Sequence, residues 1–217
     1  MRHIERLCKP RILEEKGAEW TKKFLKSHKN RPDHSKYAHK EIVETLEEMS
    51  SHKCFYCEAK LYGKKEVEHH VEVSVDRKRA YDWDNLYLSC STCNREKLDE
   101  RMIPTSETLD PCDDSDETIR ETISFNNEQI VSIDGNKRGI KTIQKYRLDR
   151  EDLDYLRLKQ LKKIDEAHDS IKDKMEREGR QKMTDEERRA LANFKELQSP
   201  FSLMARIYLE KRGWLNQ

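Results

Sequence analysis

The sequence is organised around residues 53–97, KCFYCEAKLYGKKEVEHHVEVSVDRKRAYDWDNLYLSCSTCNREK. One CxxC pair, Cys54 and Cys57, opens this stretch, and a second pair, Cys90 and Cys93, lies near its end. Two such pairs supply the four thiolates that a closed tetrahedral Zn²⁺ site needs. The segment between the pairs is longer than in a minimal zinc ribbon, so we expect it to hold something besides the metal site.

The composition indicates a small core under a highly charged surface. Of the 217 residues, 34% are hydrophobic and 40% are charged, which is typical of long exposed helices. No apolar run approaches the ~20 residues of a membrane span, and the first residues lack the apolar core of a signal peptide. We therefore expect a cytoplasmic protein with no membrane partner. Thiols stay reduced in that compartment, which favours metal over disulfides for the paired cysteines.

The charge is unevenly distributed although the net charge is only +1. Residues 61–138 are acidic, whereas the segments before and after them are basic. An acidic middle suits a divalent cation, and basic flanks suit a phosphate backbone. Mixed-sign runs are also typical of plain solvated helix faces. Both interpretations stay open at this point.

Hydrophobic periodicity predicts helices around a small β unit. Residues 11–27 and 34–50 carry apolar residues at helical spacing and predict two helices that pack on the core. Residues 67–75 and 84–97 predict a strand, a loop, a second strand and a helix. The acidic residues 104–121 are rich in turn formers and predict a loop or boundary.

The remainder predicts a hairpin followed by helices. Two β-rich runs, residues 122–125 and 129–133, flank an Asn-Asn turn. Three further segments have helical patterns: residues 141–179, residues 184–197 with a capping box at TDEE, and residues 200–212.

These elements predict an α+β, mainly helical fold. A central zinc-stapled ββα unit is preceded by helices and followed by a hairpin and a helical region. We expect residues 1–50 to form the N-terminal helical region, residues 51–110 the core with the four-cysteine zinc site, and residues 111–217 the hairpin and C-terminal helices.

The central stretch also carries groups suited to phosphodiester hydrolysis. That reaction needs an activated water, neutralised phosphate charge and a stabilised leaving oxygen. A hard cation held by carboxylate and amide oxygens serves the last two needs, and Glu68 and Asn94 supply such a pair. A neutral imidazole can accept the proton of the water, and His69 is the candidate.

These residues carry a family resemblance. The order CxxC, EHH, WDNL and CxxCNxxK resembles the HNH, or ββα-metal, endonuclease motif in its four-cysteine zinc version. The resemblance implies that Glu68 and Asn94 ligate the catalytic cation and that His69 is the general base. It also implies that Asn85 orients His69 and that Lys97 neighbours the phosphate.

Two features depart from a simple match. Glu72 stands where many family members have a proline, which loosens the prediction for the following loop. The histidine doublet also allows His69 as a metal ligand and His70 as the base. We prefer His69 as the base, because the carboxylate directly before it is the natural ligand of a hard cation. Four basic residues are candidate phosphate contacts or solvated side chains: Arg77, Lys78, Arg79 and Arg95.

A wider resemblance extends beyond the motif. The opening MRHIER, the run at residues 83–97 and the segment YRLDREDLDYLR at residues 146–157 resemble the PtuB family, HNH nucleases of Septu and retron-linked anti-phage systems. This resemblance implies a role in antiviral defence. It also implies a PtuA-like ABC-type ATPase as partner and, in retron-linked systems, a reverse transcriptase with its nucleic acid.

We therefore expect a metal-dependent HNH endonuclease with structural Zn²⁺ and a catalytic Mg²⁺ or Mn²⁺. DNA is the expected substrate, and an RNase acting on RNA such as tRNA is the alternative within the same class. The alternative from another class is a non-catalytic zinc-ribbon module that binds nucleic acid or protein. Such a module needs the four cysteines but not Glu68, His69 or Asn94.

Overall fold

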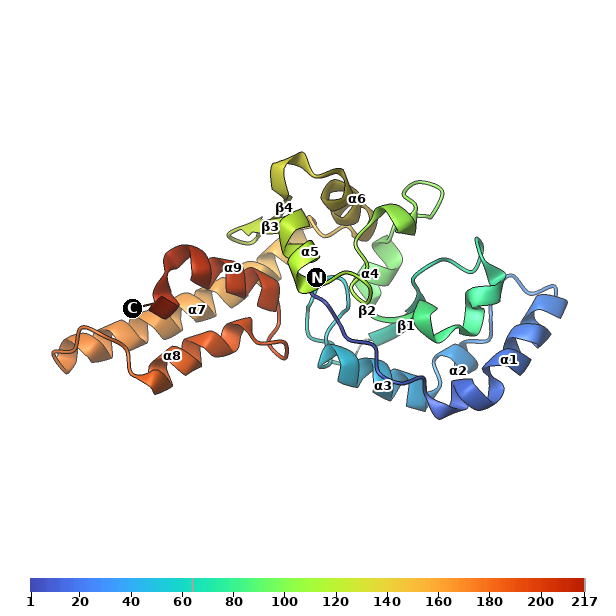
Figure 1. Cartoon of the computed structure of the whole chain (residues 1–217), viewed down its shortest axis with the longest axis horizontal. Helices are drawn as coiled ribbons and strands as arrows, with labels where there is room; N and C mark the ends of the chain where they lie inside the picture. The colour runs from blue at the N-terminus through green and yellow to red at the C-terminus, as the bar shows by residue number, and fades with distance from the viewer. Residues whose placement is uncertain (64, 217) are drawn as a thin grey trace.

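The computed structural model describes residues 1–63 and 65–216 and has a two-stranded sheet with a short helix at its centre (Figure 1). Strand β1 (Lys65–His69) pairs antiparallel with β2 (Leu86–Cys90), and Glu68 lies opposite Tyr87. Helix α4 (Ser91–Glu96) follows β2 directly. This is the predicted ββα unit.

Three helices precede this unit: α1 (Arg11–Lys26), α2 (His34–Tyr37) and α3 (Lys40–Ser50). The prediction of one helix over residues 34–50 was wrong, because the chain leaves helical geometry between α2 and α3. His39 has extended backbone angles, and its imidazole accepts a hydrogen bond from the backbone N–H of Glu41, which caps α3. The side chain of Asp33 caps α2 in the same way.

The C-terminal half contains one hairpin and five helices within the described residues. The elements are α5 (Asp116–Thr122), β3 (Ile123–Asn126), β4 (Gln129–Ser132), α6 (Lys137–Tyr146), α7 (Glu151–Arg177), α8 (Asp185–Ala192) and α9 (Ser202–Arg212). The predicted hairpin is confirmed. So is the capping box of α8, in which Thr184 and Glu187 each accept from the other's backbone N–H.

Helix α5 corrects the prediction of an irregular acidic segment over residues 104–121. Ser115 caps this helix by accepting from the backbone N–H of Thr118. Asp116 and Glu117 occupy its first turn, where negative charge favours the positive end of the helix dipole. The acidic residues that suggested a loop therefore stabilise the beginning of a helix.

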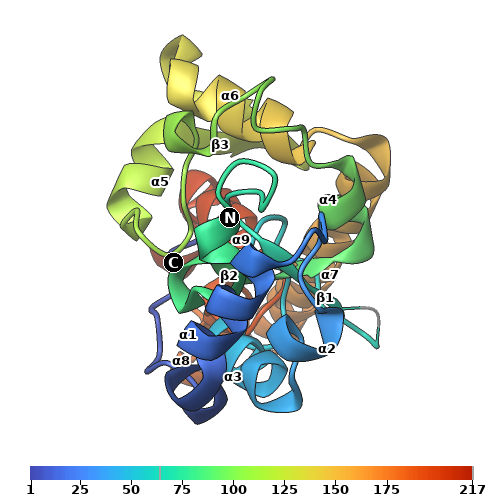
Figure 2. The same ribbon diagram turned by 90° about the vertical axis from the view of Figure 1, so that its right-hand side faces the viewer.

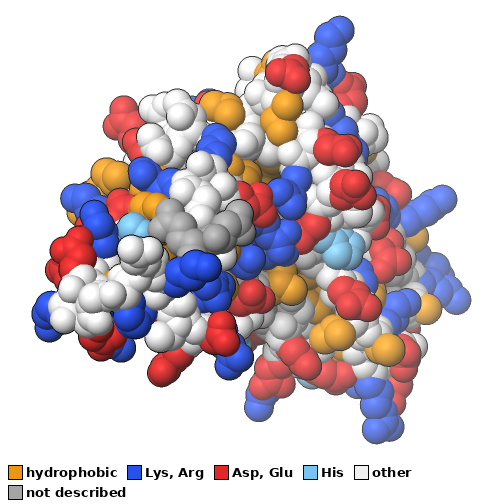
Figure 3. Space-filling view, turned by 60° about the vertical axis from the view of Figure 1, so that its left-hand side comes forward, with side chains coloured by type: hydrophobic (Ala, Val, Ile, Leu, Met, Phe, Trp, Pro, Cys, Tyr) orange, Lys and Arg blue, Asp and Glu red, His pale blue; other side chains and the backbone are white. Residues whose placement is uncertain are grey.

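The central sheet lies between two groups of helices. Figure 2 shows β1 and β2 with α1 to α3 on one side and α5 and α6 on the other. Helix α7 extends away from this body with α8 and α9 packed along it (Figure 1). On the face of the molecule that Figure 3 shows, basic and acidic side chains of the described residues are interleaved.

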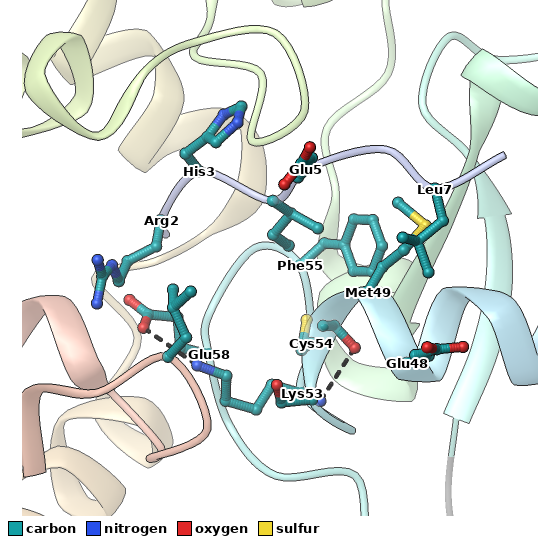
Figure 4. A pocket seen from close by; sticks show the side chains of 14 residues that line it. Arg2, His3, Glu5, Leu7, Glu48, Met49, Lys53, Cys54, Phe55 and Glu58 are labelled. Atoms are coloured by element: carbon teal, nitrogen blue, oxygen red, sulfur yellow. Dashed lines mark hydrogen bonds and ion pairs between the residues drawn. The ribbon is translucent and has the colours of Figure 1, made fainter. Parts of the chain in front are cut away.

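The buried carboxylate of Glu58 joins the N-terminal and C-terminal segments at the first cysteine pair. It accepts hydrogen bonds from the Ser202 hydroxyl at 2.7 Å and from the Met1 ammonium at 2.9 Å. Figure 4 shows Lys53, Cys54 and Glu58 facing the first residues of the chain across a cavity of about 300 Å³. Burial alone would raise the pKa of Glu58, but these charged and hydrogen-bonded partners lower it to about 2.

Throughout residues 1–63 and 65–216, none of the helices has both the length and the apolar character that crossing a membrane requires.

Candidate active site

The four paired cysteines converge as predicted. The Sγ atoms of Cys54, Cys57, Cys90 and Cys93 all lie within 4.8 Å of one another, in the range expected around one ion with Zn–S bonds of ~2.3 Å. The backbone N–H of Cys93 donates to Cys90 Sγ at 3.3 Å, as expected for a thiolate at the start of a helix. The donor set and its closure fit a structural Zn²⁺.

Helix α7 contacts this cluster through Arg150, the residue that precedes its first turn. Arg150 Nη2 donates to Cys93 Sγ at 3.5 Å. Burial disfavours the charged guanidinium, but the negative charge of Cys93 and Cys57 outweighs this effect and raises the pKa of Arg150. A zinc ion with four thiolates carries a net negative charge, so Arg150 complements it and ties α7 to the metal site.

A cleft of about 560 Å³ lies beside the ββα unit and brings together four of the predicted site residues. Glu68 and His69 reach it from the end of β1, Asn94 from α4, and Lys97 from the residue after α4. Asn85 does not line the cleft. The segment between α1 and α2 also lines the cleft, and the sequence did not connect this segment with the site.

The imidazole of His69 is held in one tautomer by a backbone carbonyl. Its Nε2 lies 2.9 Å from the oxygen of Ala80, which can only accept, so Nε2 carries the proton and Nδ1 keeps a free lone pair. The ring also packs edge-on against Tyr37 of α2, with 4.7 Å between centroids. Burial lowers the pKa of His69, which favours the neutral form that a general base requires.

The side chain of Asn85 bonds to the backbone near Ala80, and among the described residues it forms no hydrogen bond with the ring of His69. Its Nδ2 donates to the carbonyls of Val71 at 2.9 Å and Arg79 at 3.2 Å, and its Oδ1 accepts from the N–H of Val71 at 2.7 Å. These bonds close both ends of the loop that carries the Ala80 carbonyl. Asn85 therefore supports the loop next to the Ala80 carbonyl, which accepts the hydrogen bond from His69.

Glu68 is buried and oriented by two partners. Lys97 Nζ lies 2.9 Å from Glu68 Oε2, and the hydroxyl of Tyr56 donates to Oε1. A carboxylate has about four acceptor positions, so both oxygens retain capacity for a cation. Lys97 also donates to the carbonyls of His69 and His70, at 2.9 and 2.8 Å. All three of its N–H bonds are thus used inside the protein.

Asn94 is oriented by Glu66, a residue that was not among the predicted site residues. The amide Nδ2 of Asn94 donates to Glu66 Oε2. Glu66 and Glu68 alternate with Val67 along β1 and so share one face of the strand. Because the NH₂ group is taken by Glu66, the amide oxygen of Asn94 is left as the group available to a metal. The sequence offered one signal for this contact, the second carboxylate of Glu66 two positions before the predicted metal ligand Glu68.

The four candidate phosphate contacts differ in how they are used. Arg77 donates to three carbonyls at the end of α1, those of Phe24, Ser27 and Lys29. This is a structural role that occupies both of its terminal nitrogens. Arg79 and Arg95 pair with neighbouring carboxylates, those of Asp82 and Glu96. Lys78 donates its backbone N–H to Asp76 within the same loop.

His70, the other histidine of the doublet, lies in the core behind the sheet. Its ring stacks on Tyr87 with 4.3 Å between centroids, and its Nε2 lies 3.2 Å from Asp110 Oδ2. The hydroxyl of Tyr87 donates to the other oxygen of Asp110 at 2.6 Å. His70 does not line the cleft that holds His69, which supports the preferred assignment of the doublet.

Asp110→Asn is expected to destabilise the protein by about 1–3 kcal/mol, because it removes the charge that faces buried His70. Burial raises the pKa of Asp110, but the bonds from His70 and Tyr87 outweigh it and hold the pKa below its usual value. The contribution to stability is therefore present above about pH 4 and declines as the pH falls below that value. Urea unfolding at neutral and acidic pH measures it.

Asp113→Asn is the matched control, since Asp113 is exposed in the same loop. Equal unfolding midpoints for the two variants at neutral pH would contradict the role given to Asp110.

Comparison with known proteins agrees with the motif. Residues 54–100 match the family model of HNH endonucleases, which identifies this stretch as an HNH endonuclease domain. The chain is 33% identical over 100 residues to the Septu protein PtuB of Bacillus thuringiensis, covering 45% of this chain and 37% of the relative. It is 26% identical over 161 residues to the Septu protein PtuB of Bacillus mycoides (strain KBAB4), covering 59% of this chain and 54% of the relative. In both comparisons the matched region is less than two thirds of the relative's length.

Proposed function

We propose that this protein is a metal-dependent endonuclease that hydrolyses phosphodiester bonds of nucleic acid and acts in anti-phage defence. The observation that carries the proposal is the convergence of Glu68, His69 and Asn94 on one cleft beside the zinc cluster. The match of residues 54–100 to HNH endonucleases and the similarity to two Septu proteins support it.

In the proposed reaction His69 accepts a proton from the attacking water at Nδ1, while Ala80 holds Nε2–H. Glu68 and Asn94 hold a divalent cation, Mg²⁺ or Mn²⁺, through a carboxylate and an amide oxygen. When bound, that cation supplies neutralisation of the phosphate charge and stabilisation of the leaving oxygen. Lys97 and Tyr56 keep Glu68 in place, and Glu66 does the same for Asn94.

Glu68→Gln tests this assignment against the rival of a zinc-ribbon binding module. The amide oxygen of glutamine can still accept from Lys97, and its NH₂ group can donate to the hydroxyl oxygen of Tyr56, but glutamine lacks the charge that holds a hard cation. We expect cleavage of plasmid DNA or RNA in Mg²⁺ or Mn²⁺ to fall by more than ~100-fold, since the loss of outer partners alone commonly costs ~10- to 100-fold. Zinc content should stay at the wild-type level, and thermal stability should fall but leave the protein folded, because Lys97 loses a buried charged partner and keeps its two carbonyl acceptors.

Glu44→Gln is the control, because this exposed glutamate of α3 does not line the cleft. A zinc-loaded wild type that binds nucleic acid but cuts neither DNA nor RNA in either metal would instead favour the binding module.

An ABC-type ATPase is the partner we propose, in line with the resemblance to the nucleases of Septu systems. Neither relative's name refers to a retron reverse transcriptase, which stays a prediction. A deletion of the C-terminal helices, residues 140–217, would not be a clean test of whether they bind this partner. Leu203 and Leu209 are fully buried and Ser202 binds Glu58, so the deletion would also disturb the rest of the fold. Co-purification of the intact chain with a separately tagged ATPase tests the proposal, and separate elution of the two proteins argues against it.

A further inference from the structure

The segment between α1 and α2 forms one wall of the cleft. Its residues Asn30, Arg31 and Pro32 line the cleft together with Tyr37, Glu68 and Asn94. None of these residues belongs to the stretch that matches the HNH family model. The cleft is thus completed by a part of the chain outside the domain that carries the catalytic residues.

Two contacts fix this wall relative to His69. The guanidinium of Arg77 lies 4.3 Å from the centre of the Phe24 ring and donates to the carbonyls of Ser27 and Lys29. The hydroxyl of Tyr81 accepts from the backbone N–H of Asp33 at 3.1 Å. Arg77 and Tyr81 begin and end the 3-10 turn whose Ala80 carbonyl holds His69. The wall and the general base are therefore attached to the same short turn.

Among the described residues that line the cleft, the charged side chains other than Arg31 are already engaged within the protein. Lys97 spends its three N–H bonds on Glu68 and two carbonyls. Asp99 pairs with Arg101 at 2.9 Å, and Glu72 accepts the backbone N–H of Glu100.

Arg31 is exposed and, among the residues that the structure describes, forms no hydrogen bond or ion pair. Arg31 lines the cleft together with His69 and with Tyr37, the residue that packs on His69. Burial raises the pKa of Tyr37, and the positive charge of Arg31 opposes that rise.

We propose that Arg31 binds a backbone phosphate of the nucleic acid next to the bond that is cut and so positions the strand across the cleft. This inference rests on the proposed nuclease function. A guanidinium binds phosphate oxygens through paired N–H donors, and Arg31 has all of its donors available. Arg77, one of the candidate phosphate contacts in the sequence, donates to carbonyls of the segment that presents Arg31.

Arg31→Gln and Lys29→Gln form a matched pair for the test. Both remove one positive charge from the same exposed segment, but the Lys29 side chain does not line the cleft. Binding of a DNA and an RNA oligonucleotide is measured by fluorescence anisotropy at several salt concentrations, in a His69→Ala background that slows cutting, and without added Mg²⁺ or Mn²⁺. Steady-state cleavage is measured with His69 intact, and circular dichroism checks the fold of each variant.

For Arg31→Gln we expect binding to be about 10-fold weaker and the slope of log binding constant against log salt concentration to be smaller by nearly one. We also expect KM to rise about 10-fold with kcat little changed. Lys29→Gln should match the wild type in all three, and Arg31→Lys should recover part of the loss.

Two results would overturn the inference, and only the second would also contradict the proposed nuclease function. If the wild type cuts but Arg31→Gln behaves like Lys29→Gln, Arg31 is not a phosphate contact and the nuclease function stands. If the wild type cuts neither DNA nor RNA, the proposed function fails and the inference fails with it.

Discussion

His69→Ala is expected to lower the rate of phosphodiester cleavage by ~10²- to 10⁴-fold while the fold and the zinc content stay unchanged, because a general base contributes about that much. The side chain is only half-buried and makes one hydrogen bond, to Ala80, so its loss should cost little stability. Single-turnover cleavage with saturating Mg²⁺ or Mn²⁺ isolates the chemical step from binding. Nucleic-acid affinity, measured in parallel, should be nearly unaffected.

His28→Ala is the control for this variant, since His28 is exposed and does not line the cleft. A folded, zinc-loaded His69→Ala protein that cuts as fast as His28→Ala would remove His69 from the mechanism. If His70→Gln alone were inactive while remaining folded, the histidine doublet would have to be assigned in the other order. The burial of His70 between Tyr87 and Asp110 leads us to expect a stability defect from that variant instead.

The cysteine cluster and the ββα unit could be predicted from the sequence because short motifs with fixed spacing define them. Two CxxC pairs have few structural uses other than a shared metal. Glu68 and His69 at the end of β1 lie in the same cleft as Asn94 of α4, the helix that begins within the second pair. The cysteine cluster and the ββα unit follow from such short-range rules. The capping box of α8 is another example, since four consecutive residues define it.

The contacts that orient the site were beyond prediction because they join distant residues. Glu66 meets Asn94 from another element, and the carbonyl that holds His69 belongs to Ala80, which any residue type could supply. Arg77 illustrates the same limit. A basic residue in a loop near a nuclease motif suggests phosphate, yet its three carbonyl partners lie some fifty residues earlier in the chain.

Cys93→Ser is expected to have the second large effect, the loss of zinc and of most of the folded structure. Cys93 is buried, and the ion it helps to bind would hold the first cysteine pair against β2 and α4. Structural Zn²⁺ contributes apparent free energies of ~10–16 kcal/mol in zinc-finger peptides, whereas whole domains are stable by only ~5–15 kcal/mol. A serine hydroxyl does not replace a thiolate in such a site, so the remaining stability should be small.

The damage should extend beyond the ββα unit. Arg150 would lose the sulfur that it contacts at 3.5 Å, and α7 would lose its tie to the cluster. Glu58, in the turn after Cys57, holds Ser202 at the start of α9, so a loosened first pair also releases that helix. We therefore expect one cooperative loss of helical signal at a much lower temperature, together with loss of cleavage.

Cys8→Ser separates this effect from a general sensitivity of the protein to thiol loss, because Cys8 is exposed and lies outside the cluster. It should retain the zinc content, melting temperature and cleavage rate of the wild type. Added Mg²⁺ or Mn²⁺ should not rescue Cys93→Ser, since these hard cations prefer oxygen ligands to thiolates. A Cys93→Ser protein that melted like Cys8→Ser and still cut nucleic acid would mean that the four cysteines do not staple the fold, and the positions of Glu68, His69 and Asn94 would need another explanation.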